Sequence, residues 1–121
     1  MIPVKDKSKL HLIKAVGETL IEEGAASGTL PGRVRIQLNL NVEELTATSR
    51  FTLYVHGGTL TGQAAGKATS GHGGWESFSG KMTLSHGTGR YAHASGVGKM
   101  YGALYRRNDT LEVQTTGNLH F

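Results

Sequence analysis

Strict alternation of apolar and polar residues is the feature of this sequence that most constrains its fold. Between Arg33 and Val42, an apolar residue stands at every even position and a polar or charged residue at every odd one. The same period of two recurs at Phe51, Leu53 and Val55. This period places alternate side chains on opposite faces of an extended chain. We therefore expect β-strands that each bury one face.

The alternation extends along most of the chain and predicts seven or eight antiparallel strands with no helix. The expected strands cover residues 9–24, 33–42, 51–56, 60–69, 75–85, 95–106 and 111–119. A sheet of this many strands with one apolar face removes its unpaired edges by closing. The sequence therefore predicts an all-β fold, a single closed antiparallel up-and-down β-barrel of about eight strands. Residues 1–8 are expected to be a flexible N-terminal lead, and residues 9–121 to form the barrel domain.

Glycine is concentrated where the barrel interior is expected. Of 18 glycines, 13 lie between Gly57 and Gly102, and glycine or alanine occupies much of the inward parity of residues 60–68 and 96–102. An eight-stranded barrel is just wide enough to be filled by side chains or to hold one small ligand. Both outcomes are open, and we favour a partial cavity. Its expected ligand-binding residues are Leu38, Phe51, Leu53, Trp75, Phe78, Met82 and Met100.

The segment from Gly80 to Gly102 reads as a strand, a tight corner and a returning strand. Gly87 and Gly89 bracket Thr88, and both glycines are expected to take a positive φ at the corner. Trp75 follows a glycine-rich loop at residues 71–74 and is expected at the rim, either closing over a ligand or contacting another surface.

The run from Phe78 to Gly98, with its His-Gly-Thr-Gly corner followed by Arg-Tyr-Ala and Ala-Ser-Gly-Val-Gly, resembles the corner of allene oxide cyclase-like and dirigent-like β-barrels. His86 stands where that superfamily commonly has a first glycine. The resemblance covers about a third of the chain closely. It implies a β-barrel, a cofactor-independent cyclase or a coupling-guidance function, and assembly into dimers or trimers.

Two carboxylates are the candidate catalytic residues. Glu18 and Glu22 share a parity with Val16 and Leu20, so an inward face would carry a carboxyl group into an apolar interior. Burial raises the pKa of such a group and suits it to general acid chemistry. The alternative is that the face turns over after a bend at Gly17, which leaves both carboxylates in water.

Other chemistries find little support in the residues. The chain has no cysteine, so it has no disulfide or thiolate nucleophile. The stretch Gly62–Thr69 lacks the spacing and the following helix of a phosphate loop. The six histidines show no spacing of a metal site. We therefore expect no cofactor and no metal.

The net charge of +4 arises mainly near the N-terminus. Lys5, Lys7, Lys9 and Lys14 against Asp6 give +3 in the first fourteen residues. We assign these lysines to a solvated tail and expect no nucleic-acid partner. No apolar segment has the pattern of a signal peptide or the length of a membrane span, so we expect a cytoplasmic protein with no membrane partner.

The resulting functional hypothesis is a barrel that binds a small apolar molecule, with cofactor-independent cyclase or isomerase activity as a further possibility. The alternative is a non-catalytic, lipocalin-like binding barrel or an oligomerising barrel. Tyr54 and Tyr101 lie on the expected outer face, where aromatic residues favour subunit contacts. A homodimer or homotrimer is therefore expected.

Overall fold

The computed structural model describes residues 2–41, 43–70, 75–105 and 108–121, with side chains described except at residues 69, 70 and 75. These residues form eight strands and no helix. The strands are β1 (Ile2–Val16), β2 (Thr19–Gly28), β3 (Gly32–Asn41), β4 (Thr46–Val55), β5 (Gly58–Ser70), β6 (Trp75–Gly89), β7 (Ser95–Tyr105) and β8 (Thr110–His120).

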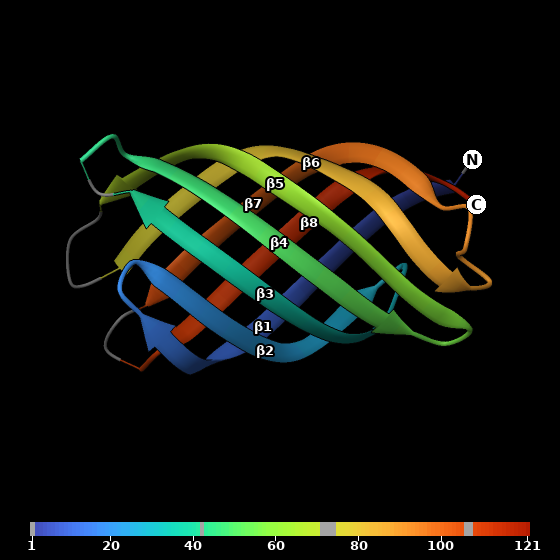
Figure 1. Cartoon of the computed structure of the whole chain (residues 1–121), viewed down its shortest axis with the longest axis horizontal. Coiled ribbons are helices and arrows are strands. Elements are labelled where there is room, and N and C mark those ends of the chain that lie inside the picture. The colour runs from blue at the N-terminus through green and yellow to red at the C-terminus, as the bar shows by residue number, and fades with distance from the viewer. Residues whose placement is uncertain (1, 42, 71–74, 106–107) are drawn as a thin grey trace.

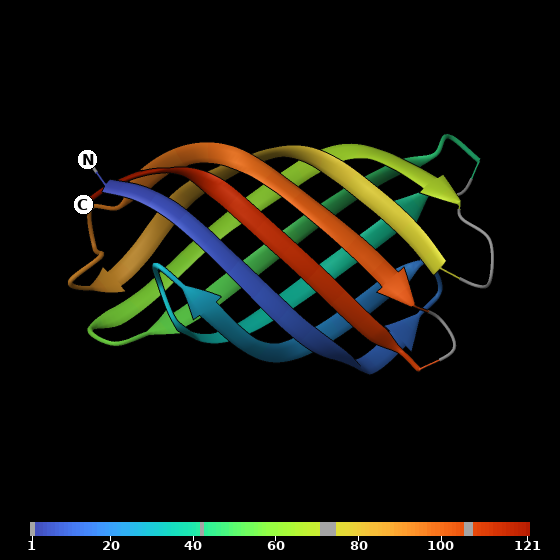
Figure 2. The same ribbon diagram turned by 180° about the vertical axis from the view of Figure 1, so that it is seen from behind.

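Each strand pairs antiparallel with the next, and β1 pairs with β8 to close the barrel. Figures 1 and 2 show the strands inclined to the long axis, with both termini at one end, here called the termini end. The fold predicted from the alternation, a closed up-and-down barrel, is confirmed. No helix that is long and apolar enough to cross a membrane occurs in the described part of the chain.

The first two strands differ from expectation. A single strand was expected over Lys9–Gly24, but the chain reverses at Gly17, which has a φ of +60°. This left-handed conformation is one that glycine adopts without steric cost. β1 and β2 therefore form a hairpin, with an irregular register between Leu12 and Lys14.

The expected N-terminal lead forms part of the barrel wall. Residues from Ile2 to His11 pair with Leu119–Thr110 of β8, and residues from Asp6 onward also pair with β2. Val4, Asp6 and Leu10 are buried, whereas the lysines between them point to solvent. These residues therefore follow the same in-and-out alternation as β3.

Two inward glycines are covered by aromatic rings from the neighbouring strand. Gly102 faces Phe78 across β6 and β7, and a Cβ atom at Gly102 would lie 2.1 Å from Phe78 Cζ. Gly62 faces Phe51 in the same manner, with Phe51 Cζ 2.7 Å from the position of a Cβ atom. The glycine faces therefore accommodate rings, and much of the space expected to be empty is filled.

The corner after β6 also differs in detail. Gly89 has the expected positive φ of +60°, whereas the φ of Gly87 is not positive. A Cβ atom at Gly87 would instead lie 2.0 Å from the backbone oxygen of Tyr91. Gly87 therefore permits the close approach of the turn, while Gly89 supplies the backbone reversal. Gly57 and Gly58, where β4 turns into β5, have φ values of +96° and +157°.

Candidate functional site

The interior half nearer the termini end contains a hollow with a cavity volume of about 40 Å³. Most of its lining is apolar and comes from strands on all sides of the barrel. The apolar lining side chains larger than alanine are Val4, Leu30, Val34, Ile36, Phe51, Leu53, Leu60, Met82, Leu84, Met100 and Val113. A concave apolar site with a few converging polar groups is the usual form of a small-molecule site.

The polar part of this cavity lies on β1 and β8. Asp6, Ser8 and Thr115 line it, and Asp6 is the direct cross-strand partner of Thr115. Asp6 is only 5% exposed, and the Leu30 N–H donates a hydrogen bond to Asp6 Oδ1 over 2.8 Å. Burial raises the pKa of the Asp6 carboxyl, while backbone hydrogen bonds from Leu30 and Thr29 oppose the shift. Asp6 is the one ionisable side chain in the described lining.

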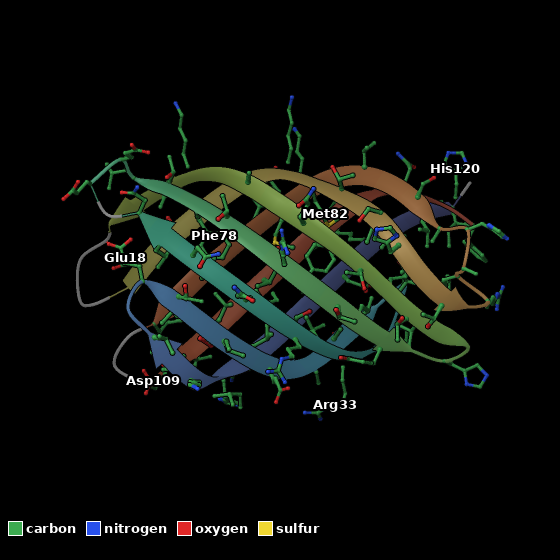
Figure 3. All side chains as sticks on the ribbon, in the orientation of Figure 1. Glu18, Arg33, Phe78, Met82, Asp109 and His120 are labelled. Carbon is green, nitrogen blue, oxygen red and sulfur yellow. The ribbon has the colours of Figure 1, made fainter. Side chains whose placement is uncertain are left out.

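The cavity is small. A volume of about 40 Å³ accommodates one or a few waters, whereas a dry cavity of about 150 Å³ binds benzene. A larger occupant therefore requires side chains to move. Met82 and Met100 both line the cavity, and methionine adapts readily because it is unbranched with three rotatable side-chain bonds. Figure 3 shows Met82 near the middle of the barrel.

The expected ligand-binding residues divide between two places. Phe51, Leu53, Met82 and Met100 line the cavity. Leu38 and Phe78, together with Met100, line a separate hollow of about 10 Å³ towards the other end. The side chain of Trp75 lies outside the part of the structure that is described.

Glu22 is fully buried, and neither of its carboxyl oxygens has a hydrogen-bond partner. Its cross-strand neighbours are Leu12 on β1 and Ile36 on β3. Burial, followed by the nearby Asp109 carboxylate, raises the pKa of Glu22 to about 7. Glu22 therefore points into the barrel, but it does not line the cavity that contains Asp6.

Glu18 takes the opposite position. It follows Gly17 in the β1–β2 turn, where it is exposed, and Figure 3 shows it at the end away from the termini. The two candidate carboxylates differ because Glu18 lies in the turn before β2 begins, whereas Glu22 lies within β2 on its inward side. Glu22 alone has the environment that the sequence analysis expected for a catalytic carboxyl group.

Asp6 was missed by the sequence analysis because its segment was assigned to a flexible lead. The signal was present in the alternation of Val4, Asp6, Ser8 and Leu10 with lysines. A strand interpretation of that pattern places Asp6 inside the barrel. Within the described residues, no group of three or more histidine, aspartate or glutamate side chains could hold a metal ion.

Comparison of the chain with protein-family models, with curated proteins and with solved structures finds no match.

Proposed function

We propose that the barrel binds a small apolar molecule that carries one hydrogen-bonding group. The observation that carries this proposal is the cavity itself, with apolar walls and a polar edge formed by Asp6, Ser8 and Thr115. The apolar part of the ligand would contact Met82 and Met100, and its polar group would face Asp6. Binding stabilises the complex mainly through removal of apolar surface from water, while the polar edge sets the ligand's orientation.

Turnover of the bound molecule is a further part of this proposal. The resemblance of residues 78–98 to allene oxide cyclase-like barrels suggests a cofactor-independent cyclisation or isomerisation in the cytoplasm. In such a reaction, confinement of a flexible substrate supplies much of the rate enhancement. Asp6 lines the cavity, and Glu22 is the other inward carboxyl group. Glu22→Gln would therefore leave apolar binding intact and change turnover only if Glu22 supplies a proton.

A non-catalytic barrel that associates with further copies is the second candidate. Tyr54 and Tyr101 are 50% and 45% exposed on the outer wall, as expected for aromatic residues that contact another subunit. Sedimentation at several protein concentrations tests this candidate, which predicts a mass of two or three chains. A single-chain mass at all concentrations would exclude it.

A matched pair of alanines on β2 tests ligand binding. Ala26 lines the cavity, whereas its neighbour Ala25 faces solvent. We expect an environment-sensitive apolar dye to bind the wild-type protein and Ala25→Leu alike. Ala26→Leu should weaken dye binding at least tenfold, because the added side chain occupies the cavity. Circular dichroism establishes that each variant is folded.

Two results would contradict the proposal. One is the absence of dye binding to the folded wild-type protein, which would indicate that the barrel is filled by its own side chains. The other is unchanged binding by a folded Ala26→Leu variant, which would place the dye elsewhere.

A further inference from the structure

The position of the N-terminal lysines changes the charge distribution of the molecule. Lys5, Lys7 and Lys9 lie on the outward side of β1 and are therefore part of the wall. The outward residues of β5, β6 and β7 add Lys67, Lys81 and Lys99. We call these six lysines the basic face. Among the described outward positions of β5–β8 and β1, Glu112 is the single acidic residue.

Lysines of the basic face lie close together across the strands. Lys81 and Lys99 are direct cross-strand partners, and Lys5 continues the same row with only Thr116 between it and Lys99. Like charges directly opposite each other on a sheet destabilise it. Within the described residues, no salt bridge involves Lys81 or Lys99. Their positive charge is therefore available to an external anion.

A groove on the outer wall adjoins this pair. It crosses β3, β4, β5 and β6, has a volume of about 770 Å³ and includes Lys81. Its polar side chains include Gln37, Asn39, Arg50, Gln63 and Thr83, and no acidic residue lines it. Arginine, lysine, threonine, asparagine and glutamine are the side chains that commonly contact the phosphates and sugars of nucleic acids.

An aromatic side chain stands beside the lysine pair. Tyr101 follows Lys99 by two residues on the outer face of β7 and is 45% exposed. Its cross-strand partners are Ser79 and Gln114. Exposed aromatic rings next to positive charge provide the stacking platform on which proteins hold unpaired bases.

We propose that the outer wall from β4 to β7 binds single-stranded nucleic acid without regard to sequence. Arg50, Lys81 and Lys99 contact phosphates, and a base stacks on Tyr101. The described wall presents strands that lie flat in the barrel, with no helix or projecting ribbon of the kind that enters a duplex groove. The side chains that line the groove are polar apart from Ala64 and Ala65, so the groove has no large apolar side chain to insert into a membrane. The sequence analysis expected no nucleic-acid partner and placed the N-terminal lysines in a solvated tail, whereas in the barrel these lysines lie in β1.

Fluorescence anisotropy with a labelled oligonucleotide of twenty thymidines tests this proposal. The test variant carries Lys81→Gln and Lys99→Gln. The control variant carries Lys14→Gln and Arg33→Gln, which removes the same charge from residues on β1 and β3, away from β6 and β7. We expect saturable binding at 50 mM salt, weakened at least tenfold in the test variant and by less than twofold in the control.

The salt dependence and the stacking residue provide two further measurements. Loss of two phosphate contacts should reduce the slope of log affinity against log salt concentration by about 1.4. Tyr101→Ala should weaken binding by about fivefold or more, whereas Phe121→Ala, which removes an exposed aromatic ring after the end of β8, should not change it.

Three outcomes would overturn the proposal. The first is no binding of the oligonucleotide at 50 mM salt. The second is equal weakening in the test and control variants, which would show that only the net charge matters. The third is tighter binding to a DNA duplex or to vesicles rich in phosphatidylserine than to the single strand at the same salt concentration.

Discussion

Glu22 has an unusual environment for an acidic residue, because both of its carboxyl oxygens are buried without a hydrogen-bond partner. An ionised carboxylate in such a place is strongly disfavoured, and the group binds a proton more tightly instead. Its pKa is raised from 4.5 to about 7, so the neutral acid is favoured below neutral pH. A buried neutral acid can donate a proton, but Glu22 lies outside the cavity lining.

This shift predicts how stability depends on pH. Between pH 4.5 and 7 the folded state holds the Glu22 proton and the unfolded state releases it. The free energy of unfolding should therefore decrease as pH rises through this interval, by up to about 3 kcal/mol. Glu22→Gln should abolish most of this decrease. Urea unfolding of the wild-type protein and of Glu22→Gln at several pH values measures this decrease.

Glu18→Gln is the matched control, because Glu18 is exposed in the β1–β2 turn. It should show the same pH dependence as the wild-type protein. Asp6, whose pKa is also raised, adds a decrease of the same sign that both variants retain. Equal slopes for Glu22→Gln and wild type between pH 5 and 7 would contradict a buried, unpaired Glu22.

Gly102 provides a second residue-level prediction. The three atoms nearest to a Cβ atom there all belong to the Phe78 ring, so Gly102→Ala should displace the ring and destabilise the barrel by about 1–3 kcal/mol. In a Phe78→Leu background, the smaller leucine side chain leaves room for the added Cβ atom. Gly102→Ala should then lower the free energy of unfolding only slightly. Denaturant unfolding of the four proteins in this double-mutant cycle gives the coupling energy. An equal cost in both backgrounds would show that Phe78 does not cover Gly102.

Only some of the site residues could be predicted at this scale. Phe51, Leu53 and Met82 were placed inside because alternation determines which side of a strand faces inward. Sequence could not show that Phe78 turns its ring over Gly102, because that contact depends on the register of two strands. Asp6 was missed because its segment was assigned to a tail. The alternation in that segment was therefore not used to decide which residues face inward.

At the scale of elements, β1 carries the largest difference between expectation and structure. The pattern in β3 is uninterrupted over ten residues and predicts a strand directly. β1 has the same alternation, but its high lysine content resembles that of a solvated tail. The hairpin at Gly17 was read as a bend because one glycine does not by itself distinguish a bend from a complete reversal.

Hydrogen exchange tests the position of β1. Residues 6–11 have β8 on one side and β2 on the other, so their amides should be protected to the same degree as those of residues 34–40 in β3. Backbone hydrogen bonds in a central strand open only through larger unfolding events. Amide exchange followed by NMR measures both sets in one sample. Exchange of the amides of residues 6–11 at the rate of an unstructured chain would contradict the pairing of β1 and support a flexible N-terminal segment.

At the scale of the whole molecule, the two proposed binding sites lie on opposite sides of the barrel wall. The interior is apolar, and its large glycine-lined faces are partly occupied by Phe51 and Phe78. The outer wall carries lysines from strands that are distant in sequence. These lysines form one face only because β1 pairs with β8. The closed barrel could be predicted from alternation, but the cavity volume and the basic face could not, because both depend on the register of the closed sheet.

The interior provides its own reporters for the central claim that the barrel binds a small apolar molecule. Met82 and Met100 line the cavity from β6 and β7, and their methyl groups can be observed by NMR after labelling with ¹³C. Hexan-1-ol combines an apolar chain with one hydroxyl group and is a suitable probe. On titration with hexan-1-ol, both methyl resonances should shift together to a plateau, and Ala26→Leu should abolish the shift. Unchanged resonances up to the solubility limit of the alcohol, or equal shifts in a folded Ala26→Leu variant, would contradict binding in this cavity.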